Sequence, residues 1–275
     1  MSEQRGESDE RRGIGGGWSS QHGRRTAAAQ AGFFLPYLRE GMTILDCGCG
    51  PGSITLGLAA AVAPGDVIGV DVDARRIAEA KALAIDAGTS NVTFQLADIY
   101  QLPFPDDYFD GVYEHATLEH LDDPRAAIQE IRRVLKPGAV FGASDRMIMA
   151  AIHAPEWPDD EGLLREHLEL VRRYRKSTGS DLNFGLRLFG LLQELGFVDV
   201  WGSVSPEFYS EYGNKRSAID SAIARVRTTP FGDFAIRECG AERLEQQIAA
   251  WNRLAESPRA WFCEFNGESV GTKAR

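Results

Sequence analysis

The segment that most constrains the fold is ILDCGCGPGSITLGLA, residues 44–59. A short apolar run reaches Asp46, three glycines follow at alternate positions, and a second apolar run of helical length comes next. Glycine permits left-handed backbone conformations and lets a ligand approach the main chain closely. The order predicts a strand, a tight glycine turn and a helix, the context in which a glycine motif indicates ligand binding.

The spacing of these glycines separates two classes of ligand. The dinucleotide fingerprint is G-x-G-x-x-G, whereas Gly48, Gly50 and Gly52 form G-x-G-x-G. The carboxylate of Asp46, two residues before the first glycine, would repel a pyrophosphate and attract a cation. S-adenosylmethionine carries a sulfonium and an ammonium and no phosphate. The motif therefore favours this ligand over the nicotinamide cofactor of a dehydrogenase.

Strand-like and helix-like segments alternate from residue 43 to residue 144, which is the pattern of an α/β domain with a mostly parallel sheet. A turn at Lys136-Pro137-Gly138 should separate the last of these helices from the strand that follows it. Strands are predicted at 43–46, 66–71, 92–97, 109–113 and 139–144, and helices at 54–63, 75–87 and 124–135.

Two further carboxylates follow predicted strands. Asp71 lies 71 − 46 = 25 positions after Asp46, about where a Rossmann-like fold places the acid that binds the ribose hydroxyls. Asp98 follows the third strand, where it could accept from an adenine amino group while Ile99 packs on the ring. The alternatives are a strand-end carboxylate in solvent for Asp71 and an ordinary turn residue for Asp98.

Composition limits the partners and the compartment. The chain has 275 residues, a formal net charge of −10 and a pI of about 5.1, which disfavours a nucleic-acid partner. We see no apolar run long enough to cross a membrane and no signal peptide, so we expect no membrane partner and a cytoplasmic location. Cys47 and Cys49 form a C-x-C pair with no second pair nearby, so we expect no metal site.

Four segments together resemble class I S-adenosylmethionine-dependent methyltransferases, a family that includes quinone-ring C-methyltransferases and many natural-product enzymes. They cover most of residues 41–145. The resemblance implies a Rossmann-like, doubly wound, mostly parallel seven-stranded sheet with helical insertions that form a cap. The segments are LDCGCGPG, GVDVDARRIAEAKA, NVTFQLADIYQLPFPDDYFDGVYEHATLEHLDDP and IRRVLKPGA.

The same resemblance implies where S-adenosyl-L-methionine binds. Its methionine end would lie among the glycine loop, its ribose beside the second strand, its adenine after the third strand, and its sulfonium just past the fourth strand. The sequence departs from many relatives at Glu114-His115, where those carry a small or an amide residue. The residues implied are Asp46, Gly48 and Gly50 for the methionine end, Asp71 and Val72 for the ribose, Asp98 and Ile99 for the adenine, and Glu114 or His115 for the sulfonium.

Catalytic candidates cluster in HATLEHLDDP, immediately after the fourth strand. A sulfonium is already a good methyl donor, so the protein has to align the acceptor and exclude water, and a hydroxyl or acidic carbon acceptor also needs a base. His115, Glu119 and His120 are the candidates. The alternative for His120 is packing, because many relatives share its leucine-flanked turn. His22 is a further candidate base.

The sequence also predicts how the chain is organised into four successive parts. We expect a disordered arm at 1–20, a methyltransferase core at 21–205 with a lid insertion at 147–179, a helical insertion at 206–258, and a last strand and tail at 259–275. Gln21, His22 and Arg24 would close over the cofactor, and Arg187 would pair with an anionic group of the acceptor or with a surface acid. The aromatic residues that could line an acceptor pocket in the second insertion are Phe208, Tyr209, Tyr212, Phe231, Phe234 and Trp251.

The function these features favour is methylation of a small, apolar metabolite at oxygen, nitrogen or carbon, as in secondary metabolism, by a chain that could form a homodimer. One alternative is a peptide or protein acceptor, which would need an open groove. Another is a protein that binds S-adenosylmethionine without transferring its methyl group. Fold analogy cannot choose the acceptor.

Overall fold

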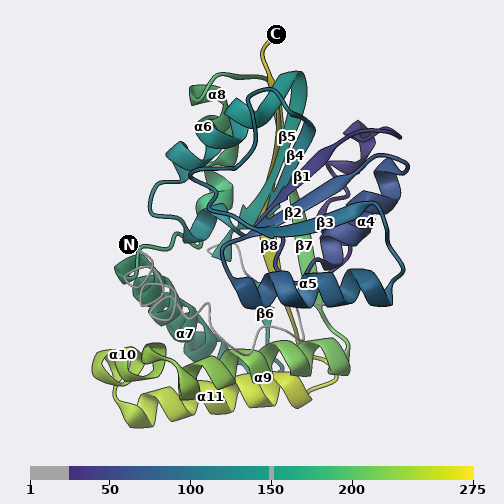
Figure 1. The fold of residues 1–275 in the computed structure, drawn as a ribbon. Coiled ribbons are helices and arrows are strands. Elements are labelled where there is room, and N and C mark those ends of the chain that lie inside the picture. Colours follow the sequence, from purple (N-terminus) through teal and green to yellow (C-terminus); the bar gives the residue numbers. More distant parts are fainter. Residues whose placement is uncertain (1–24, 149–151) are drawn as a thin grey trace. The chain divides into compact units, whose positions relative to one another are not determined.

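The structure is a computed structural model that describes residues 25–148 and 152–275 (Figure 1). These residues divide into two compact units. The core unit comprises residues 25–146, Asn183–Ser205 and Asn266–Arg275, and the insertion unit comprises the described parts of Met147–Leu182 and Pro206–Phe265. The two expected insertions thus belong to one unit, and the final strand is divided after Phe265. The predicted arm at 1–20, with Gln21, His22 and Arg24, lies outside the described residues.

A mostly parallel sheet organises the core unit. Its parallel strands follow the order β3-β2-β1-β4-β5, β8 pairs antiparallel with β5 from Asn266 onward, and β7 pairs with β8. Among the described residues this sheet has eight strands, one more than the seven that the resemblance implied, because β6 (Ile152–Ala154) of the insertion unit also pairs with β8. Seven of the eight strands contribute residues to the core unit. The strands are β1 (Ile44–Cys47), β2 (Val67–Asp71), β3 (Val92–Leu96), β4 (Phe109–His115), β5 (Leu135–Arg146), β7 (Phe197–Tyr209) and β8 (Trp261–Lys273).

The order of these strands reverses at β1. The chain runs from β1 outward to β2 and β3 and then returns to β4 on the other side of β1. Open α/β sheets bind ligands outside the carboxyl ends of their strands at such a reversal. In the register of β1, Cys47 is paired with Val70 on one side and Glu114 on the other, so the ends of these strands share one edge.

Helices cover both faces of the core sheet. Successive residues of a strand point to opposite faces, and both faces of β1 are buried: Ile44 packs with one apolar cluster and Leu45 with another. The Ile44 cluster includes side chains of α4, and the Leu45 cluster includes side chains of α6 and α8. The helices of this unit are α3 (Ala27–Gln30), α4 (Ser53–Val62), α5 (Ala74–Asp86), α6 (Pro124–Val134) and α8 (Leu188–Glu194).

The predicted turn at Lys136-Pro137-Gly138 is wrong. Helix α6 ends at Val134, and β5 begins at the next residue without an intervening turn. The register of β4 with β5 instead shifts between two of its pairs, Phe109↔Leu135 and Gly111↔Val140. The proline and the glycine, which has φ +82°, are accommodated in this irregular stretch of strand.

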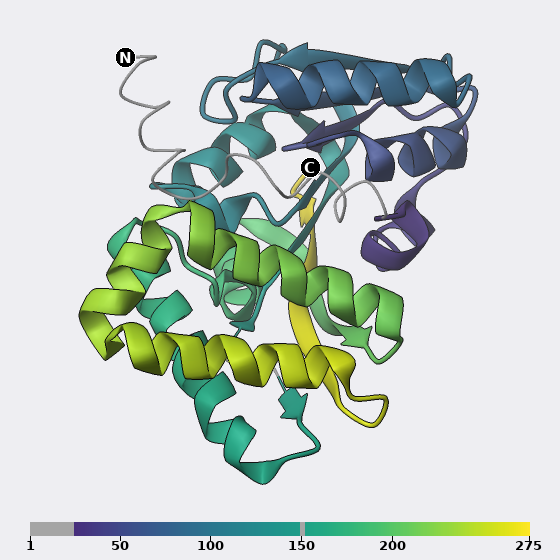
Figure 2. The same cartoon turned by 90° about the horizontal axis from the view of Figure 1, so that it is seen from below.

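In its described residues, the insertion unit consists of four α-helices and a short strand pair. Helices α9 and α11 run side by side, and α7 and α10 also pack on α11 (Figure 2). The predicted lid helix is α7. The elements are β6 (Ile152–Ala154), which pairs antiparallel with the start of β8, and α7 (Pro158–Ser177), α9 (Tyr212–Thr228), α10 (Pro230–Cys239) and α11 (Ala241–Glu256).

Aromatic side chains make up much of the interior of the insertion unit. Phe231 and Trp251 are buried in its two apolar clusters, and Phe234 packs against one of them. The Tyr209 ring stacks on Phe262 at a centroid distance of 4.4 Å. Phe208 remains half exposed. Most of these rings therefore have a packing role within the unit.

No helix in the described ranges combines the length and apolar character that a membrane span needs.

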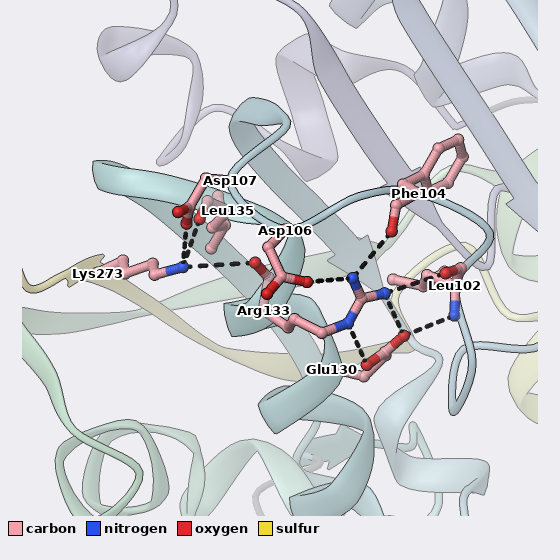
Figure 3. Close-up of polar contacts among 8 residues, drawn as sticks. All are labelled: Leu102, Phe104, Asp106, Asp107, Glu130, Arg133, Leu135 and Lys273. Atoms are coloured by element: carbon pink, nitrogen blue, oxygen red, sulfur yellow. Dashed lines mark hydrogen bonds and ion pairs between the residues drawn. The ribbon is translucent and has the colours of Figure 1, made fainter.

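Two cations fasten the loop before β4 to the rest of the core unit (Figure 3). The Arg133 guanidinium, on α6, donates to both oxygens of Glu130, to Asp106 and to the carbonyls of Leu102 and Phe104, at 2.7–3.0 Å. Lys273 Nζ donates to Asp107 at 2.6 Å and to the carbonyl of Leu135 at 2.7 Å. Arg133 lowers the pKa of Glu130.

We expect Arg133→Lys to lower the free energy of unfolding by about 1–3 kcal/mol, because an ammonium cannot reproduce the forked contacts and leaves loop carbonyls unpaired. Urea denaturation checks this. Arg125→Lys is the matched control, since Arg125 makes an exposed ion pair with Glu194, for which we expect a change under about 0.5 kcal/mol. Equal losses in both variants would contradict the role given to Arg133.

Candidate active site

The carboxyl ends of the parallel strands bring most of the predicted site residues to one edge of the core unit. Asp46 lies in β1, Asp71 ends β2, and Glu114 and His115 end β4. Asp98 comes two residues after β3. In the parallel register, Asp46 is paired with Gly69 on β2 and with Tyr113 on β4, so Asp71 and Glu114 follow within two residues of its level.

Glycine suits the three glycine positions of the loop after β1 for different structural reasons, although all three have positive φ. A Cβ on Gly48 would lie 2.1 Å from Thr117 Oγ1, and one on Gly52 would lie 2.8 Å from the Phe94 ring. A Cβ on Gly50 would meet no atom of a described residue within 4 Å. Two glycines therefore allow close packing of the protein, and Gly50 is the one that borders open space.

Asp46 is a buried acid with one strong side-chain contact. It is 3% exposed, and Thr55 Oγ1 donates to its Oδ2 at 2.6 Å. Burial raises the pKa of Asp46 from an ordinary 3.8 to about 7, the Thr55 hydrogen bond opposes this, and the charge of Asp71 adds to it. A cation beside Asp46 would relieve this cost.

Asp71 fixes the backbone around it. Its Oδ2 accepts from the Gly50 N–H and its Oδ1 from the Asp73 N–H, both at 2.9 Å. Burial raises the pKa of Asp71, and these two hydrogen bonds oppose the rise. The carboxylate thus connects the end of β2 to the open glycine of the loop.

The predicted adenine contacts lie beyond β3. Asp98 Oδ1 accepts from the Tyr100 N–H at 3.0 Å, and Asp98 forms a β-bridge with Gln101. Ile99 is partly buried against the core cluster, and Val72 is 59% exposed. A role for these residues toward adenine or ribose stays a prediction.

Glu114 links the end of β4 to β5 and to the turn that follows β4. It is fully buried, its Oε1 accepts from the Ser144 N–H at 3.1 Å, and its Oε2 accepts from the Thr117 N–H at 3.2 Å. Burial, followed by the charge of Asp145, raises the pKa of Glu114 well above its usual range. Its carboxyl oxygens are engaged by backbone, and its contact with the sulfonium stays a prediction.

The three catalytic candidates follow one another through a strained turn. His115 is buried at the end of β4, and Ala116 after it has φ +53°. Glu119 is 1% exposed, its Oε2 accepts from the Arg146 N–H at 3.0 Å, and its Oε1 lies 3.3 Å from His120 Nε2. Glu119 therefore connects this turn to β5. The catalytic roles of these residues stay a prediction.

The cysteines of the loop have packing environments. Cys47 and Cys49 are buried, and burial raises the pKa of both thiols. In the part of the chain that the structure describes, no three His, Cys, Asp or Glu residues are placed to hold a metal ion. Arg187 lies over the Phe184 ring at 5.4 Å.

Sequence reasoning missed Thr55 and Asp145. Asp145 is fully buried, and its Oδ1 accepts from the Glu119 N–H at 3.2 Å. A charged residue near the end of an apolar strand is a signal for such a site. Thr55, a polar residue early in the apolar helix SITLGLAAAV, is another.

Comparisons with known proteins point to one family. A family model described as a methyltransferase domain matches residues 45–142. The Bacillus subtilis protein named uncharacterized methyltransferase YcgJ is 35% identical over 230 residues, which are 82% of this chain and 79% of that protein. An uncharacterized methyltransferase of Schizosaccharomyces pombe is 29% identical over 92% of both chains. The O-methyltransferase resE of Aspergillus sclerotiorum is 37% identical over 60% of both.

Solved structures agree on the fold. The crystal structure of YcgJ superposes with a TM-score of 0.55 at 24% identity, covering 89% of this chain and 97% of that one. The [4+2]-cyclase SpnF gives 0.55 at 22% identity, covering 92% and 85%. The sheet order, the glycine loop after β1 and the similarity to YcgJ along most of both sequences lead to one conclusion: the chain belongs to the class I S-adenosylmethionine-dependent methyltransferases.

Proposed function

We propose that this protein transfers a methyl group from S-adenosylmethionine to a small, apolar metabolite. The observation that carries the proposal is the pairing of an open glycine, Gly50, with two buried acids, Asp46 and Asp71, at the reversal point of the sheet. Neither acid has an ion pair with a cation among the contacts of the described residues. A cationic ligand suits such a site.

The residues present fit the cofactor. Asp46, with its pKa raised to about 7, would attract the positive charges of the methionine end. Asp71 would bind the ribose hydroxyls through lone pairs that its two backbone contacts leave available. Gly50, which borders open space, would allow the ligand to approach the loop.

Bound S-adenosylmethionine supplies an activated methyl group. The chain's own residues then have to hold the acceptor in line, exclude water and remove a proton where the acceptor is a hydroxyl or an acidic carbon. His115 is the proposed base, because it stands at the end of β4 beside the strained Ala116 turn. Backbone strain of this kind is often found where a fold positions reactive groups.

The names of related proteins support an apolar acceptor. Two Aspergillus relatives, resE and rstn1, are named O-methyltransferases, at 37% and 34% identity over 60% and 58% of this chain. Relatives over shorter stretches are named demethylmenaquinone methyltransferase and sterol 24-C-methyltransferase. Both of those names denote apolar acceptors. The acceptor atom differs among these relatives. We therefore infer that the methyl group is transferred to an oxygen or a carbon atom of the acceptor.

A second candidate is a protein that binds S-adenosylmethionine without transferring its methyl group. The fold shared with a [4+2]-cyclase favours keeping this candidate. The two candidates differ in one measurable respect, the fate of the methyl group.

Incubation with S-adenosylmethionine labelled on the methyl group, in an extract of the source organism, tests the proposal. We expect label in the organic-soluble fraction and release of S-adenosylhomocysteine. Label in acid-precipitable material would identify a peptide or protein acceptor. Binding of the cofactor with label in neither fraction would favour the second candidate.

We expect Asp46→Asn to stabilise the ligand-free protein more at high pH than at low pH. The folded-state pKa of Asp46 lies above its unfolded value, so the cost of the buried charge grows as the pH rises from about 4 to about 7. The advantage of the variant should be about 2–3 kcal/mol larger at pH 8 than at pH 5. Its affinity for S-adenosylmethionine should fall at least about tenfold.

Denaturant unfolding at the two pH values measures the difference. Asp86→Asn is the control, since Asp86 is an exposed residue at the end of α5. Its effect on the free energy of unfolding should be the same at pH 5 and at pH 8. A pH-independent effect of Asp46→Asn would show that Asp46 does not carry the raised pKa.

We expect His115→Gln to lower turnover of the labelled acceptor by about 10²–10⁴-fold, because general-base catalysis contributes in this range. Affinity for S-adenosylmethionine should stay within about threefold, as the base acts on the acceptor. Single-turnover kinetics and a binding titration separate the two quantities. Unchanged turnover would assign His115 to packing alone.

A further inference from the structure

Thr55 is a buried hydroxyl that the proposed chemistry does not yet use. It lies in the first turn of α4 and is 0% exposed. Its Oγ1 donates to Asp46 Oδ2 at 2.6 Å, a short distance typical of hydrogen bonds to a charged oxygen. The contact joins the helix after the glycine loop to the strand before it.

Among the described residues, the causes that shift the pKa of Asp46 include no cation. Asp71 on β2 is an acid, and its charge raises the pKa of Asp46. Cys47 and Cys49 flank the loop and Tyr113 lies opposite on β4, and the charge of Asp46 helps to raise the pKa of all three. The Thr55 hydrogen bond acts in the other direction. It is therefore the contact in this set that favours the charged carboxylate.

We propose that Thr55 is a positioning residue of the cofactor site, whose hydroxyl orients the Asp46 carboxylate and holds it in the charged form that attracts a cationic ligand. This inference rests on the proposed function, since it assigns Asp46 to the cofactor. Thr55 acts through Asp46 and needs no contact with the cofactor.

The inference gives cofactor binding a specific pH dependence. A cation binds the charged carboxylate, so affinity should rise with pH and level off above the pKa of Asp46, which is about 7. Without the hydroxyl that pKa rises further, so the affinity reaches its plateau at a higher pH. A purely structural role of Thr55 would weaken binding equally at every pH.

Isothermal titration of S-adenosylmethionine between pH 6 and pH 9 tests this. We expect Thr55→Val to weaken binding about tenfold at pH 6.5 and less than about threefold at pH 9. Below the pKa of Asp46, a rise of about one unit in that pKa lowers the charged fraction of the carboxyl about tenfold. Thr55→Ser keeps the hydroxyl and should stay within about twofold of the natural protein throughout. Titration of the ligand's own amino group is common to all variants and cancels in their ratios.

Thr228→Val is the control, because Thr228 also lies on a helix but its Oγ1 donates to a backbone carbonyl, that of Ala224 at 2.8 Å, and not to a carboxylate. It should not change the profile. Thr55→Ala replaces Thr55→Val if the valine prevents folding, as judged by a thermal melt. A ratio that is constant with pH in the variant without the hydroxyl would overturn the inference and leave the proposed function intact. No binding by the natural protein at any pH would instead refute the proposed function.

Discussion

The parallel pairing of β1 with β2 on one side and β4 on the other is the constraint on which the site depends. It gives Cys47 two neighbours, Val70 and Glu114, and so aligns the ends of three strands. The loop after β1 is held in that position by the Asp71 contact to Gly50 and by the close approach of Gly48 to Thr117. These contacts within the chain therefore fix the backbone of the loop at this edge.

Burial of acids at this edge has a cost for the ligand-free protein. Asp46, Glu114 and Asp145 are all at most 3% exposed, and burial raises the pKa of each. Glu114 and Asp145 are engaged by backbone N–H groups of the neighbouring strand and turn. Asp46 depends on Thr55 and, in our proposal, on a cationic ligand. This difference separates the acids that hold the fold from the acid assigned to binding.

Much of the core unit could be predicted from local sequence. Apolar runs and the glycine motif located β1 to β4 and α4 to α6 to within one or two residues, since these signals act over neighbouring positions. The start of β5 was missed, because the register of β5 against β4 decides that the proline and the glycine after α6 belong to a strand. The grouping of the two insertions into one unit depends on packing between α7 and α11, which are far apart in the chain. The contact of Glu114 with the Ser144 N–H likewise forms only once two strands that are distant in the chain pair.

The most direct test of the account is a crystal structure of the protein with S-adenosylhomocysteine. The account predicts ligand density along the open side of Gly50, with polar groups of the ligand within hydrogen-bond distance of the Asp46 and Asp71 carboxylates. Density at another place, or no density with the ligand at saturating concentration, would contradict the assignment of this edge as the cofactor site.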